Sequence, residues 1–191
     1  MKSLHKIYAF GLLLLATMLF TACADDATPK PDAFLRLDYP MGTYKLFDEG
    51  CPYTFGINSL AKVKDKGNCN IEIYYPKMKA TIYLTYKPVH NNIDSLLRDA
   101  ETLTYKHVIK ASEITGQPYL NFDKSVYGMF SQVGGNAATN AQFYVTDSVH
   151  HFVTGSMYFY AKPNFDSLMP AASYLKDDMR NIMETLKWKK Q

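Results

Sequence analysis

The clearest pattern in the chain is a strict alternation of apolar and polar positions in two short stretches, 70–75 and 80–86. The apolar positions are Ile71, Ile73, Tyr75, Ala80, Ile82, Leu84 and Tyr86. A period of two residues is typical of a β-strand with one buried face. The sequence Pro-Lys-Met-Lys separates the two stretches and supplies a turn, so we expect an antiparallel hairpin.

Three further strands are predicted between 125 and 161, where β-branched and aromatic residues dominate. Gly134-Gly135-Asn136 and Asp147-Ser148 interrupt this region and have the composition of tight turns. The aromatic segment 34–60 contains several Pro and Gly residues, and we expect short strands or extended pieces there.

Two stretches have helical periodicity instead. The apolar stripe of the first, from Ile93 to Ala111, includes His107, and Asn91 or Asn92 is a plausible N-cap. The second begins at Phe165, after Pro163-Asn164, and its stripe continues to Leu186.

These elements predict an α+β fold in the order β-β-α-β-β-β-α, with a mainly antiparallel sheet of five or more strands and two amphipathic helices packed on it. The alternation divides the sheet into an apolar face, which we expect the helices to cover, and a second face, called here the polar face. The apolar face comprises Ile71, Ile73, Ile82, Leu84, Phe143, Val145, Val153, Met157 and Phe159. The polar face comprises Tyr74, Thr81, Tyr83, Thr85, Gln142, Tyr144, Thr146, Thr154, Ser156, Tyr158 and Tyr160.

The polar face has two interpretations. The aromatic segment 34–55 folds across it, or it is an exposed aromatic platform for a protein or a glycan. Under the second interpretation, Tyr144, Tyr158 and Tyr160, with Asn136 from the adjacent turn, form a possible partner surface.

The N-terminus has the pattern of an export signal. Lys2 and Lys6 precede an apolar run that is too short to span a bilayer and ends just before Cys23. We therefore expect a lipoprotein signal peptide at 1–22, with Cys23 as the lipidated residue; an ordinary secretory signal with an incidental cysteine is the alternative. Residues 23–33 are polar and bear prolines, which favours a flexible tether. The remaining 34–191 have the length and composition of a single globular α+β domain.

Cys51 and Cys69 remain after lipidation of Cys23. Each lies near a strand end in a chain with an export signal, so we expect a disulfide, with Cα atoms about 4.4–6.8 Å apart. A pair of buried or metal-binding thiols is the alternative, although no Cys-x-x-Cys motif or neighbouring histidine supports a zinc site.

Charge and motifs exclude several function classes. Removal of Lys2 and Lys6 leaves 19 of the 21 basic residues against 18 acidic ones, a net charge of +1 without a basic cluster, so a nucleic-acid partner is not expected. His150 and His151 are consecutive on a strand and point to opposite faces, so they cannot easily share a metal ion. No catalytic residue, cofactor site or metal site is predicted.

Several runs of sequence identify a family. They are CPYTF (51–55), YLTYKP (83–88), TLTYKH (102–107), the long run from Val126 to Leu168, and METLKWK (183–189). Together they resemble the gliding-motility lipoprotein GldD family of Bacteroidetes, over essentially the whole mature chain. The run LFTAC (19–23), which resembles a lipobox, and the two remaining cysteines stand where the family has them.

The resemblance implies a lipid-anchored protein of the cell envelope. The anchor is expected in the outer membrane, in either its periplasmic or its surface leaflet. It also implies a non-enzymatic role in gliding motility and type IX secretion, through contacts with other envelope proteins. It brings no catalytic residue and no cofactor. An envelope glycan-binding protein, or an enzyme with an unrecognised pocket, is the alternative.

Overall fold

The structure is a computed structural model that describes residues 39–105, 111–135, 141–160 and 165–190. The chain divides into two units, 1–33 and 34–191, and all described residues belong to the second. The signal peptide, the tether, Cys23, His107 and Asn136 lie outside the described residues.

Strands make up most of the described unit. Its elements are β1 (Tyr44–Phe47), β2 (Tyr53–Asn58), β3 (Lys62–Asp65), β4 (Ile71–Tyr75), the 3₁₀ turn η1 (Pro76–Met78), β5 (Ala80–Pro88), α2 (Ile93–Tyr105), β6 (Ala111–Asn121), β7 (Val126–Gly135), β8 (Ala141–Thr146), β9 (His151–Phe159), α3 (Phe165–Thr185) and β10 (Lys187–Trp188).

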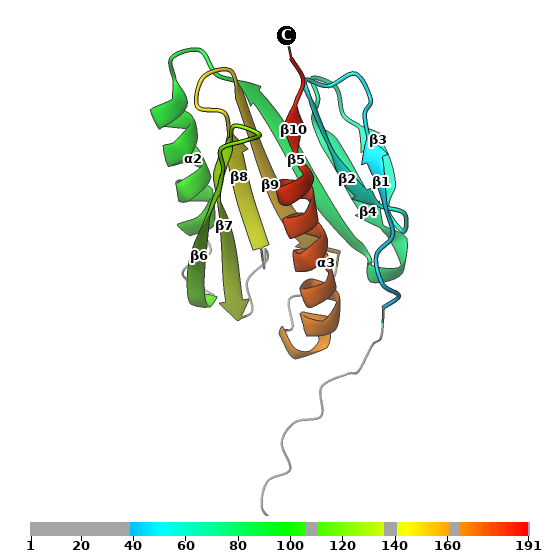
Figure 1. The fold of residues 1–191 in the computed structure, drawn as a ribbon. Helices are drawn as coiled ribbons and strands as arrows, with labels where there is room; N and C mark the ends of the chain where they lie inside the picture. The colour runs from blue at the N-terminus through cyan, green and yellow to red at the C-terminus, as the bar shows by residue number, and fades with distance from the viewer. Residues whose placement is uncertain (1–38, 106–110, 136–140, 161–164, 191) are drawn as a thin grey trace, which may run out of the picture. The chain divides into compact units, whose positions relative to one another are not determined.

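The strands form two sheets (Figure 1). The large sheet has seven strands in the order β3-β4-β5-β9-β8-β7-β6, and every neighbouring pair is antiparallel. The small sheet has the order β1-β2-β10 and is also antiparallel. This arrangement confirms the predicted α+β class with an antiparallel sheet.

The apolar face of the large sheet carries the main core. Its side chains pack with α3 and with residues of β1 and β2 in one buried cluster that includes Phe55, Ile82, Phe143 and Leu175. The small sheet and α3 lie side by side on this face, because the Asn181 amide of α3 donates a hydrogen bond of 3.0 Å to the Gly56 carbonyl of β2. The described part of the aromatic segment 34–55 therefore packs on the apolar face and does not fold across the polar face.

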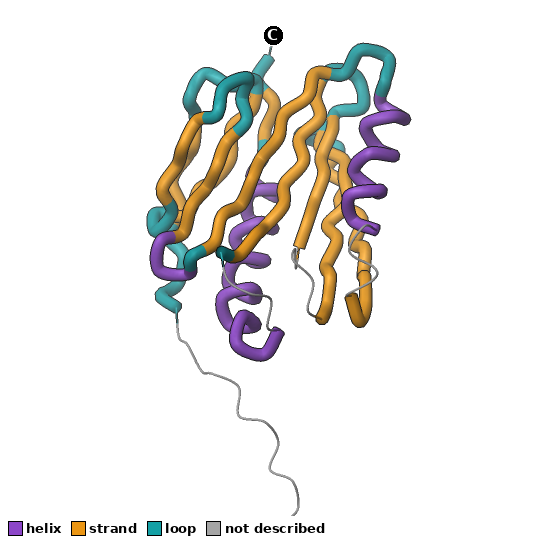
Figure 2. The backbone as a smooth tube through the Cα atoms, turned by 180° about the vertical axis from the view of Figure 1, so that it is seen from behind, coloured by secondary structure: helices purple, strands orange, loops and turns teal. Residues whose placement is uncertain are grey.

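Helix α2 packs on the opposite, polar face (Figure 2). Leu96 and Ala100 of α2 bury against Phe152, a residue of β9 that pairs with Thr146 of the polar face. The expectation that both helices cover the apolar face is thus wrong for α2. The reason is Phe152, whose large ring makes a local apolar spot on an otherwise polar surface.

The predicted hairpin is present as β4 and β5, with Ile73 opposite Ile82 and a turn that ends at Lys79 in the left-handed conformation, φ 48°. The three strands predicted between 125 and 161 are β7, β8 and β9. The described part of the first helix runs from Ile93 to Tyr105, and the predicted extension to Ala111 is wrong because Ala111 begins β6. The predicted order β-β-α-β-β-β-α lacks β1, β2, β3, β6 and β10. Short strands or extended pieces were expected at 34–60, where β1 and β2 lie, but β3 was not expected.

Candidate functional site

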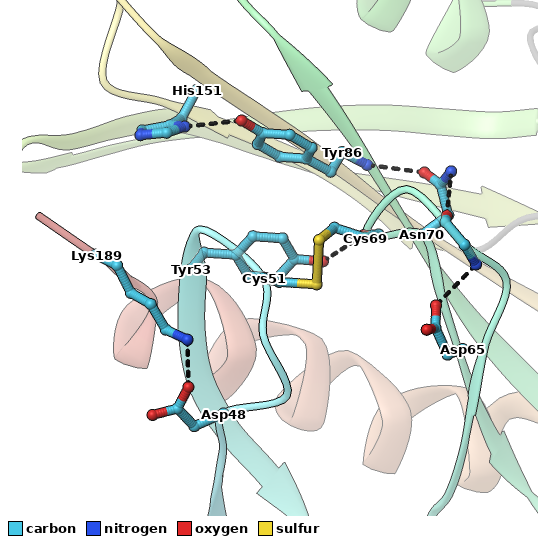
Figure 3. Close-up of a disulfide and its surroundings, with 10 residues drawn as sticks. Asp48, Cys51, Tyr53, Asp65, Cys69, Asn70, Tyr86, His151 and Lys189 are labelled. Carbon is cyan, nitrogen blue, oxygen red and sulfur yellow. Dashed lines mark hydrogen bonds and ion pairs between the residues drawn. A yellow bond between two sulfur atoms is a disulfide. The ribbon is translucent and has the colours of Figure 1, made fainter. Parts of the chain in front are cut away.

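The disulfide joins the segment before β2 to the β3–β4 turn (Figure 3). The Cα atoms of Cys51 and Cys69 lie 5.4 Å apart, within the range expected for a bridge, so the predicted pairing is confirmed. The Tyr53 hydroxyl donates a hydrogen bond of 2.8 Å to the Cys69 carbonyl oxygen. Both covalent and hydrogen bonding therefore hold the β3–β4 turn against β2.

A row of four aromatic side chains, called here the aromatic column, continues from the disulfide. Tyr53 stacks on Tyr86 at 5.9 Å between ring centroids, Tyr86 lies 5.9 Å from His151, and His151 stacks on Trp188 at 5.1 Å. The Tyr86 hydroxyl is 2.9 Å from Nδ1 of His151 (Figure 3). Burial lowers the pKa of His151, although Asp147 opposes the shift, so the imidazole is neutral at neutral pH and behaves as a packed ring.

Asp147 organises the turn between β8 and β9. One of its carboxylate oxygens accepts backbone N–H bonds from Val149, His150 and His151 at 3.0, 2.8 and 2.8 Å. Burial alone would raise the pKa of this carboxyl, but these three bonds outweigh it and lower the pKa. The predicted turn at Asp147-Ser148 is confirmed, and Ser148 adopts φ 70°.

Four tyrosines of the polar face, called here the tyrosine patch, lie on β4, β5 and β9 and directly after β9. They are Tyr74, Tyr83, Tyr158 and Tyr160. Tyr74 meets Tyr160 edge-on at 6.3 Å, and Tyr83 meets Tyr158 edge-on at 5.7 Å. Figure 2 shows no described helix over β4 and β5, because α2 lies toward β8 on this face.

The hydroxyl groups of the tyrosine patch are linked. The Tyr160 hydroxyl is 3.0 Å from the Tyr83 hydroxyl and 3.0 Å from Thr81 Oγ1. The hydrogen bond with Tyr160 raises the pKa of Tyr83 to about 12, and the bond with Thr81 lowers the pKa of Tyr160. The patch thus presents aromatic edges and ordered hydroxyls at the surface, and Tyr160 is 60% exposed.

Tyr144 differs from Tyr158 and Tyr160, with which the sequence groups it. Its ring stacks on Phe152 at 5.8 Å, beside the cluster that holds α2, and burial raises the pKa of its hydroxyl. The structure therefore brings Tyr158 and Tyr160 together and places Tyr144 in the packing of α2. Asn136 lies outside the described residues.

Asp178 of α3 is the one acidic side chain in the described core, with 2% exposure. It accepts hydrogen bonds from the Tyr44 hydroxyl at 2.5 Å and from the Asn58 amide at 2.8 and 3.0 Å. Burial raises the pKa of this carboxyl despite these bonds. These hydrogen bonds connect α3 to β1 through Tyr44 and to β2 through Asn58.

The described residues contain no group of three or more His, Cys, Asp or Glu side chains placed to bind a metal ion. Within the same residues, no helix combines the length and apolar character needed to cross a membrane.

A comparison with family models decides the identity. The model described as "Gliding motility lipoprotein GldD" matches residues 24–188. The chain belongs to the GldD family. No curated protein gives a match. Membership in GldD makes the protein a gliding-motility-associated lipoprotein and implies anchoring in the membrane of the cell envelope.

Sequence reasoning missed the aromatic column of this GldD protein. Trp188 reaches the column because β10 pairs with the start of β2, with Trp188 opposite Tyr53. The sequence analysis treats His151 only as one of two adjacent histidines that cannot easily share a metal ion. The signal that favours packing is its position between aromatic and β-branched neighbours at the start of β9.

Proposed function

We propose that the protein acts without enzymatic activity, as a lipid-anchored component of the gliding-motility and type IX secretion machinery that works through contacts with other envelope proteins. The observation that carries this proposal is the family match, which covers residues 24–188 and therefore nearly the entire globular unit. Cys23 is the lipidated residue in this proposal.

The roles of the ionisable side chains support a non-enzymatic function. Asp147 is occupied by backbone N–H groups, His151 by Tyr86 and Trp188, and Asp178 by Tyr44 and Asn58. The shifted pKa of each of these three groups therefore has a structural explanation, and the three groups need no substrate to account for it.

The tyrosine patch is the surface that we assign to a protein partner. Tyrosine combines large apolar area with a hydroxyl and is enriched at protein interfaces. Tyr158 and Tyr160 retain the role that the sequence suggested for them. Asn136 stays part of the proposed surface as a prediction from the sequence.

The proposal is tested in a deletion strain that is scored for export of type IX cargo, for surface spreading and for the proteins recovered with the tagged wild type. The strain is then complemented with Tyr160→Ala or with Tyr105→Ala. Tyr105 of α2 is 62% exposed, close to the 60% of Tyr160, and it lies outside the tyrosine patch, so it is a matched control.

We expect the deletion to abolish cargo export and spreading, Tyr160→Ala to reduce partner recovery, and Tyr105→Ala to behave as the wild type. Normal cargo export and spreading in the deletion strain would overturn the proposed function. Equal partner recovery with Tyr160→Ala and Tyr105→Ala would contradict the assignment of the tyrosine patch as the partner surface.

A further inference from the structure

A cleft of about 680 Å³ opens at the end of the large sheet where the described chain ends. The β6–β7 turn, the β8–β9 turn and residues 187–190 line it, three segments that are far apart in the sequence. Tyr39, the first described residue, lies beside η1 at the opposite end of the same strands. The cleft is therefore separate from the point at which the chain enters the globular unit, and it is not part of the tyrosine patch.

The cleft carries an excess of positive charge. Its charged side chains are Lys124, Lys187, Lys189, Lys190, Asp123 and Asp147. Lys189 pairs with Asp48, and Asp147 is engaged by the backbone of its own turn. Lys187 and Lys190 form no ion pair with any described residue, so their ammonium groups are available to an anion.

Trp188 fixes the geometry of the cleft. Its indole Nε1 donates a hydrogen bond of 2.9 Å to the Ser125 carbonyl oxygen, which ties β10 to the β6–β7 turn. Its ring stacks on His151 at the end of the aromatic column. Lys187 therefore belongs to a strand that pairs with β2 and is anchored by the Trp188 ring, and Lys190 follows Trp188 by two residues.

Aromatic rings also line the cleft, because Trp188 and His151 belong to its lining. Free phosphate has no apolar group to place against these rings, whereas an acidic peptide segment can pack apolar atoms on them while its carboxylates meet the lysines.

We infer that this cleft binds an acidic segment of a partner protein, with Lys187 and Lys190 receiving its carboxylates and the Trp188 ring contacting its apolar atoms. The inference rests on the proposed function in one respect, namely that the partner is a protein. It assigns a second contact surface, of different chemistry from the tyrosine patch.

The experiment uses the mature lipoprotein in a non-ionic detergent. Trp188 is the single tryptophan of the chain and lines the cleft, so its fluorescence reports binding there. The probes are a hexaglutamate peptide, a hexaglutamine peptide, inorganic phosphate and an acidic oligosaccharide. The variants are Lys187→Gln with Lys190→Gln, and a control pair, Lys62→Gln with Lys77→Gln, which removes the same charge beside the cavity at the opposite end of the strands.

We expect hexaglutamate to bind and hexaglutamine not to bind. Added salt should weaken the binding, because exposed charges are screened at high ionic strength. The cleft pair should lose roughly tenfold in affinity, as expected for two exposed ion pairs, while the control pair keeps the wild-type affinity. The four lysines are exposed, so circular dichroism should show the same fold in all variants.

Absence of hexaglutamate binding, or equal affinity in the cleft and control pairs, would overturn the inference. Tighter binding of phosphate or of the oligosaccharide than of hexaglutamate would overturn the choice of a protein segment. These results are separate from those of the deletion strain, because peptide binding by the purified protein does not depend on a motility or secretion phenotype.

Discussion

Removal of the Cys51–Cys69 disulfide should destabilise the domain without changing its fold. The perturbation is the double substitution Cys51→Ala and Cys69→Ala, which opens the covalent loop and keeps both β-carbons. Cys51 is 6% exposed, so a small alanine avoids placing a new polar group in the core.

The sequence separation of 18 sets the magnitude. Closing a loop of this length removes chain entropy from the unfolded state that is worth about 3 kcal/mol at 25 °C. A domain of this kind has a free energy of unfolding of roughly 5–15 kcal/mol, so the loss is a substantial share of its stability.

The assay is equilibrium unfolding in guanidinium chloride, followed by Trp188 fluorescence and by far-ultraviolet circular dichroism. Coincident transitions would show two-state unfolding and permit comparison of free energies. Wild type treated with a reductant is the control: it should lose the same free energy, and the double variant should not respond to the reductant. A loss below about 1 kcal/mol in the double variant would contradict the loop-entropy argument.

Three further predictions address other parts of the chain. A methyl group at Gly155 would overlap the Phe143 ring, so Gly155→Ala should lower the free energy of unfolding by roughly 1–3 kcal/mol, and Phe143→Leu should recover part of this loss in the same denaturation assay. The raised pKa of Asp178 means that the folded state binds a proton at this carboxyl more readily than the unfolded state, so the contribution of Asp178 to stability should fall as pH rises above its ordinary pKa of 3.8. The free energy of unfolding of the wild type relative to Asp178→Asn should therefore decline with pH over this range, and an identical pH profile of the two proteins would contradict the reasoning. Cys23→Ser should leave the protein unprocessed or release it from membranes, which fractionation and mass spectrometry of the N-terminus would show, whereas unchanged acylation would exclude Cys23 as the anchor.

The sequence predicts best those elements that bury one regular face. The β4–β5 hairpin follows from alternation because Ile71, Ile73, Ile82 and Leu84 are at most 2% exposed. Helix α3 follows from its stripe because that stripe packs into the main core. In the hairpin and in α3, the spacing of apolar residues along the sequence matches the spacing of buried positions in the strand or helix.

Strand β6 could not be predicted in this way. It is the edge of the large sheet and pairs only with β7, so most of its described side chains are exposed and no apolar alternation is required. Pro118 also lies within it, which is tolerated because an edge strand has backbone N–H groups that need no partner. The first helix was predicted to continue to Ala111 because no apolar alternation marks the start of β6.

The assignment of helices to faces required information that alternation does not contain. Alternation shows which residues share a face, but the covering element is chosen by tertiary contacts. Phe152, with the Tyr144 ring stacked beside it, gives the polar face enough apolar area to hold Leu96 and Ala100 of α2. Trp188 and the cleft were missed for a related reason, since β10 has only two residues and its place depends on pairing with β2.

The disulfide, the aromatic column and the basic cleft form one physically connected region. The disulfide holds the β3–β4 turn against β2, Tyr53 of β2 begins the column, and the column ends at Trp188 in the cleft. Each step is a direct contact between packed rings or a hydrogen bond, so displacement of β2 would move β10 and the lysines that flank Trp188. Because stacked rings in a close-packed interior transmit small shifts, we expect formation of the disulfide to restrict the position of Lys187, the β10 residue next to Trp188, as well as to stabilise the fold.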